Sequence, residues 1–127
     1  MKNTEGSMKH RVWFDQDHNA LRIRFVGLCG RKDVVELGKI FRELMDKKET
    51  RRALIDLSDI ESFPDEDVRE QLADETQAAG FSKVAVVGSR PEVKIVGRIM
   101  IERLGKQVKT EFFLNEEQAI KWLNGSG

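Results

Sequence analysis

Short apolar segments alternate with amphipathic segments over most of this chain, and that alternation constrains the fold more than any other feature. The apolar segments at 21–26, 53–57, 84–87 and 108–113 have the length and β-branched content of strands. Between them, apolar residues recur at spacings of three and four, which is typical of amphipathic helices. With a further short strand at 11–14, the expected order is ββαβαβαβα. Strands that alternate with helices predict an α/β domain with parallel crossover connections.

The first two strands are expected to pair as an antiparallel hairpin, because a cluster of turn-forming residues at 15–19 separates them. The sequence therefore predicts a mixed five-stranded sheet with an N-terminal antiparallel hairpin. Strands 21–26 and 108–113 each alternate apolar and charged residues, so each keeps one charged face. That face carries Arg22 and Arg24 in the first strand and Lys109 and Glu111 in the second. Four helices are accordingly expected mainly on one face of the sheet. The uninterrupted apolar run 84–87 predicts a strand that is covered on both faces.

Helix boundaries are indicated by capping residues. The first helix is expected over 31–48, and the second begins after Asp65 and extends to about residue 79. Pro91 is expected as the first residue of the third helix, because proline is favoured at that position. Asn115 is predicted to cap the last helix, with Gln118 at the third position of a capping box.

Length and charge limit the classes of function. The 127 residues predict one domain over 11–124, with tails at 1–10 and 125–127. The 22 basic and 22 acidic residues cancel, which argues against a nucleic-acid partner. No apolar run is long enough for an integral membrane segment, and the single cysteine fits a cytoplasmic protein. No cofactor is expected.

The junction between the strand at 53–57 and the following helix is the strongest candidate for a partner-binding surface. A polar loop is expected from Ser58 to Ser62, followed by an acidic helix start. The alternative interpretation is that the acidic residues only cap the helix and complement its dipole. We expect no metal site there, because consecutive carboxylates splay around one helical turn. The candidate residues are Ser58, Asp59, Ser62, Phe63, Asp65, Glu66 and Asp67.

Two other places are candidates for a binding or reactive site. Ser89 and Arg90 follow a strand and open a helix, so they are a weaker candidate for anion binding, with a simple turn as the alternative. Cys29 precedes a helix, which can activate a thiol. A catalytic cysteine would need a histidine, and His10 in the tail and His18 in the hairpin turn are both expected on the surface. The sequence therefore predicts an inert thiol, no catalytic residue and no metal site.

Five aromatic residues are candidates to line an apolar cavity, with an ordinary hydrophobic core as the alternative. They are Trp13, Phe41, Phe112, Phe113 and Trp122.

Several segments resemble STAS domains, in particular the SpoIIAA-like (STAS/Sec14-like) group, over about Leu21 to Leu123. They are LRIRFVGLCGRKDVVELGKIF, ALIDLSDIESF, KVAVVG, IVGRIMIERL and FFLNEEQAIKWL, of which the last is the most specific. The resemblance implies a SpoIIAA-like fold and a non-enzymatic, regulatory protein-binding role like that of the anti-sigma factor antagonists.

The resemblance also implies a phosphorylatable serine after an aspartate at the helix start. Here Asp65 is followed by Glu66 and Asp67, so that serine is missing. Some members of the group have been proposed to bind small apolar ligands, which makes a carrier of an apolar or lipid-like molecule the alternative function. The polar face of the sheet is a possible homodimer surface.

Overall fold

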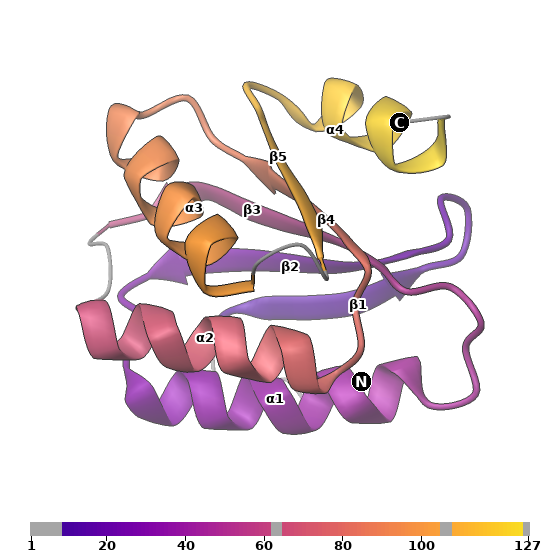
Figure 1. Ribbon diagram of the computed structural model, residues 1–127, viewed down its shortest axis with the longest axis horizontal. Helices are drawn as coiled ribbons and strands as arrows, with labels where there is room; N and C mark the ends of the chain where they lie inside the picture. Colours follow the sequence, from indigo (N-terminus) through magenta and orange to yellow (C-terminus); the bar gives the residue numbers. More distant parts are fainter. Residues whose placement is uncertain (1–8, 62–64, 105–107, 126–127) are drawn as a thin grey trace.

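The computed structural model describes residues 9–61, 65–104 and 108–125, apart from the side chains at 96, 97, 99 and 100. Its strands and helices follow the expected order ββαβαβαβα (Figure 1). The strands are β1 (Arg11–Asp15), β2 (Ala20–Gly27), β3 (Arg52–Ile60), β4 (Lys83–Val87) and β5 (Lys109–Phe113). The helices are α1 (Arg31–Met45), α2 (Glu66–Ala78), α3 (Pro91–Leu104) and α4 (Glu116–Asn124).

The five strands form one sheet in the order β1-β2-β3-β4-β5. β1 and β2 are antiparallel, whereas β2, β3, β4 and β5 run parallel to one another. The predicted mixed sheet with its N-terminal hairpin is therefore confirmed. In a parallel sheet the carboxyl ends of the strands share one edge, so the loops after β2, β3 and β4 lie at the same edge.

Helices cover the two faces of the sheet unequally. Along β3, Ala53, Ile55 and Leu57 belong to the larger apolar cluster, whereas Leu54 belongs to the smaller one. α1, α2 and α3 contribute to the larger cluster and α4 to the smaller one, so three helices lie on one face and α4 on the other (Figure 1). Successive side chains of a strand point to opposite faces of the sheet, so β3 contributes residues to both clusters.

β4 is buried on both faces, as its continuous apolar run predicted. Val84 and Val86 join the larger cluster, and Ala85 and Val87 join the smaller one. Helix starts were also predicted well: Pro91 is the first residue of α3, and the Asn115 side chain accepts a hydrogen bond from the Gln118 amide at 2.9 Å.

Three local expectations were wrong. α1 ends at Met45 instead of Lys48, because the chain turns at Lys47, which has a positive φ of 66°. β3 continues to Ile60 instead of giving way to a loop at Ser58, because Ile60 is buried and its strand pairs with Gly27 beyond an irregularity in β2. Arg22 is buried instead of solvated, because its guanidinium pairs with Asp15 and with Glu116 at the start of α4.

Candidate partner-binding surface

Ser58 and Asp59 lie near the end of β3, and both are exposed. The Ser58 amide donates to the Asp56 carboxylate at 2.9 Å, which fixes the direction of the backbone there. Asp59 Oδ2 accepts two hydrogen bonds from Arg24 of β2, from Nε at 2.8 Å and from the guanidinium Nη2 at 2.7 Å. The charge of Asp59 is therefore matched by a neighbouring strand.

The start of α2 carries three exposed carboxylates: Asp65, Glu66 and Asp67. Asp65 occupies the N-cap position, but its side chain makes no capping hydrogen bond, contrary to expectation. Asp67 pairs with Arg31 at the start of α1, and Arg31 also donates to Gln71 at 3.3 Å. Within the described part of the chain, no ion pair engages Asp65 or Glu66.

Ser62 and Phe63, the remaining candidate residues, lie outside the described residues. The structure thus separates the described acidic candidates into two kinds. Asp59 and Asp67 are each neutralised by an arginine and help to join neighbouring elements. Asp65 and Glu66 keep their charge directed to solvent.

Leu28 is an exposed apolar residue that directly follows β2, at the sheet edge where β3 also ends, and the sequence reasoning did not single it out. The residue is 56% exposed. It follows Gly27, whose carbonyl accepts a hydrogen bond from the Glu61 amide at 2.8 Å, so the ends of β2 and β3 lie side by side. Gly27 has a φ of +72°, and a β-carbon there would meet the Lys9 side chain at 3.0 Å, so glycine is required.

The signal available in the sequence was an exposed-type position, Leu28, directly after the strand-ending Gly27. We call the group formed by Leu28, Ser58, Asp59, Glu61, Asp65, Glu66 and Asp67 the strand-end surface.

Arg90 does not present a free anion site. Its guanidinium donates to the carbonyl of Ile60, the last residue of β3. Gly88, two residues earlier, packs so closely on Val93 that a β-carbon would lie 2.6 Å from that side chain. Ser89 is exposed at this junction. The contacts therefore favour a bracing role for the β4–α3 turn, which supports the end of β3.

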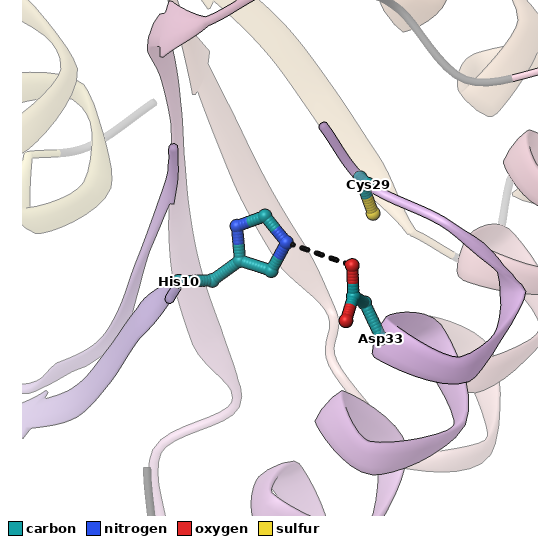
Figure 2. A group of neighbouring side chains, drawn as sticks. All are labelled: His10, Cys29 and Asp33. Carbon is teal, nitrogen blue, oxygen red and sulfur yellow. Dashed lines mark hydrogen bonds and ion pairs between the residues drawn. The ribbon is translucent and has the colours of Figure 1, made fainter. Parts of the chain in front are cut away.

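His10, Cys29 and Asp33 form a compact polar cluster that the sequence reasoning did not predict (Figure 2). His10 was expected on the surface, which is wrong: it is only 1% exposed, and its ring packs edge-on against Phe25. Its Nε2 lies 3.3 Å from Asp33 Oδ2, and its Nδ1 accepts a hydrogen bond from the Val26 amide at 3.0 Å. Asp33 Oδ2 also accepts from the Gly30 amide at 3.1 Å.

The hydrogen bonds of His10 decide what this cluster can do chemically. An amide N–H can only donate, so Nδ1 must carry a lone pair and Nε2 must carry the proton in the neutral ring. Neither nitrogen then has a free lone pair for Cys29 or for a metal ion. Coordination through Nε2 would require the ring to give up the Val26 hydrogen bond. Burial raises the pKa of the Cys29 thiol to about 12, and the nearby Asp33 carboxylate adds to the effect.

A thiol with that pKa is protonated at neutral pH and is a poor nucleophile. The hydrogen bonds and the protonated thiol therefore favour a structural role for the cluster.

The five aromatic residues do not share one cavity. Phe41 contacts Phe81 in the three-helix core and Phe112 packs on the same cluster, whereas Phe113 and Trp122 contact each other on the α4 face. Trp13 is 38% exposed and stacks with Arg22. An open hollow near α4 is lined by polar residues and Ile120; its other lining residues are His18, Asn115, Glu116, Glu117 and Lys121.

None of the helices in the described ranges is long and apolar enough to cross a membrane.

Comparison with protein families matches residues 20–124 to the family described as SpoIIAA-like. An uncharacterized protein of the DUF3478 family with a SpoIIAA-like fold, from Shewanella loihica PV-4, has a TM-score of 0.67 and 19% sequence identity. That alignment covers 94% of this chain and 98% of the other. The anti-sigma factor antagonist SpoIIAA in its unphosphorylated form aligns with a TM-score of 0.59 and 15% identity, covering 90% of this chain and 95% of the other. No curated protein sequence matches the chain.

Proposed function

The chain belongs to the SpoIIAA-like family, and on that premise we propose that it is a non-enzymatic regulatory module that binds a protein partner through the strand-end surface. One protein with the same fold is an anti-sigma factor antagonist, which is a role that depends on binding another protein. The fold alone does not assign the role, because one fold supports many functions. The proposal therefore depends on the surface itself.

The observation that carries the proposal is an exposed leucine after β2 and uncompensated carboxylates at the start of α2, both at the carboxyl edge of the sheet. Leu28 is 56% exposed, and the neighbouring strand end and the start of α2 carry exposed acidic side chains. An apolar centre with a charged rim is the usual composition of a protein–protein interface. Because Asp65 and Glu66 have no ion-pair partner among the described residues, the proposed partner surface is expected to be basic at its rim.

Regulation through a phosphoserine at the helix start is not part of the proposal. The positions after Asp65 hold Glu66 and Asp67, which supply fixed negative charge. A carboxylate has less charge and one oxygen fewer than a phosphate, so it is a weak substitute for a switchable group. The strand-end surface is proposed to be competent for binding without modification.

The experiment compares capture of partners by the full chain and by surface variants. Leu28→Asp and the double variant Asp65→Lys/Glu66→Lys are expected to lose the partner that the wild-type chain captures from a lysate of its source cells. Glu117→Lys is the matched control, because Glu117 is an exposed acidic residue in the first turn of α4 on the opposite face of the sheet. This control is expected to retain capture.

Equal capture by all four proteins would contradict the proposal. The alternative function, a carrier of an apolar molecule, predicts a different result. Native mass spectrometry of gently purified chain would then show an additional mass that is lost on denaturation. Such a mass would favour the carrier over the docking module.

A further inference from the structure

The loop that presents Leu28 is held at both of its ends by side chains. At one end the Val26 amide donates to His10 Nδ1, and at the other end the Gly30 amide donates to Asp33 Oδ2. The two acceptor side chains are themselves joined, because His10 Nε2 lies 3.3 Å from the same Asp33 oxygen (Figure 2). A continuous chain of hydrogen bonds therefore spans the loop from Val26 to Gly30.

The imidazole replaces a missing backbone partner. The register of the β1–β2 ladder ends at the pair Arg11 and Arg24, so the Val26 amide lies beyond it. His10 Nδ1 satisfies that amide from within a pocket where the histidine is 1% exposed. Only the neutral ring can accept this bond, because protonation places a hydrogen on Nδ1 that points at the amide hydrogen.

We propose that His10, Val26 and Asp33 form an acid-sensitive latch that holds the Leu28 loop in place and opens when the imidazole is protonated. The groups that face the ring are the Asp33 carboxylate from α1, the Cys29 thiol from the loop, the Phe25 ring from β2 and the neighbouring Lys9. Asp33 favours the charged ring, whereas burial and Lys9 oppose it. The consequence for partner capture rests on the function proposed above, but the latch itself does not.

The direction of the pH effect follows from proton binding. Burial lowers the pKa of His10 below its ordinary value of 6.5, despite the hydrogen bond and the charge of Asp33. Between 6.5 and the lower folded-state pKa, the unfolded chain binds more protons than the folded chain. The free energy of unfolding is therefore expected to fall as the pH drops below about 6.5, and this contribution is fully present above that pH.

The test is an NMR titration of the isolated, ¹⁵N-labelled full chain from about pH 8 to about pH 5, the range in which histidine changes charge. At the upper end, His10 is expected to show a bare Nδ1 and a protonated Nε2. On acidification, protonation of Nδ1 and loss of Val26 amide protection from solvent exchange are expected to occur together. An Nδ1–H tautomer at the upper end, or Val26 protection that persists after Nδ1 is protonated, would overturn the latch.

Three variants and one metal ion sharpen the result. His10→Asn offers an amide oxygen to Val26 without a titrating group, so its Val26 protection is expected to stay constant over the same range, whereas His18→Asn is expected to behave like wild type. If His10→Asn does not fold, the tautomer of the wild-type ring still decides whether the latch exists.

Equimolar Zn²⁺ is expected to leave the His10 signals unchanged. A Zn²⁺-induced shift that disappears in Cys29→Ser would overturn the proposal, because it would show that Nε2 is open to a ligand. None of these measurements requires a partner, so failure of the latch and failure of the docking proposal are distinguishable.

Discussion

The starts of α1 and α2 lie side by side, joined by the Arg31–Asp67 ion pair, yet the two helices begin in opposite ways. At α1, the Asp33 carboxylate accepts from the Gly30 amide and lies against buried His10. At α2, the side chain of Asp65 makes no capping bond and Glu66 is exposed. Both starts are acidic, which suits the helix dipole. An acidic helix start can therefore be bonded within the fold, as at α1, or left exposed to solvent, as at α2.

The largest expected effect is a difference in stability between the two aspartates. Asp33→Ala removes hydrogen bonds to Gly30 and His10 and leaves the buried imidazole N–H unsatisfied, so we expect a loss of about 2–4 kcal/mol. Asp65→Ala removes only a favourable charge near the helix dipole, so we expect a loss of about 0.5 kcal/mol.

Urea denaturation at neutral pH measures both losses. Similar losses of unfolding free energy for the two variants would show that the aspartate at the α1 start stabilises the fold no more than the aspartate at the α2 start.

The smallest expected effect is on the contact that joins the two starts. The side chains of Arg31 and Asp67 are 58% and 61% exposed, and exposed ion pairs contribute little. We expect Arg31→Ala to cost about 0.3 kcal/mol, and the cost to shrink as salt is added. A double-mutant cycle with Asp67→Ala, repeated at low and high salt, isolates the pair; a coupling above about 1 kcal/mol would mean that the two starts act as one unit.

Much of the fold was predictable because its signal is local. The apolar run at β4 and the three- and four-residue spacing in α1 identify their elements without knowledge of distant contacts. The extension of β3 was not predictable in this way. Ile60 is buried because it pairs with Gly27 beyond a register shift in β2, and hydrophobic periodicity within one segment carries no information about such pairing.

The site was predicted less completely for the same reason. His10 bonds to residues 16 and 23 positions away, so a sequence window around it shows only a polar residue near the chain end. Arg24 and Arg31 neutralise Asp59 and Asp67 from other elements, and that division of the acidic cluster depends on the tertiary fold. The acidic character of the α2 start was visible in the sequence, whereas the role of each carboxylate was not.

Amide hydrogen exchange of the free chain, resolved by residue, tests the contrast between a closed α1 start and an open α2 start most directly. The account predicts protection at Val26 and Gly30, whose amides donate to side chains, and fast exchange at Glu66 and Asp67, which begin a helix without a side-chain cap. Equal protection at the two helix starts, or faster exchange at Val26 and Gly30, would contradict it.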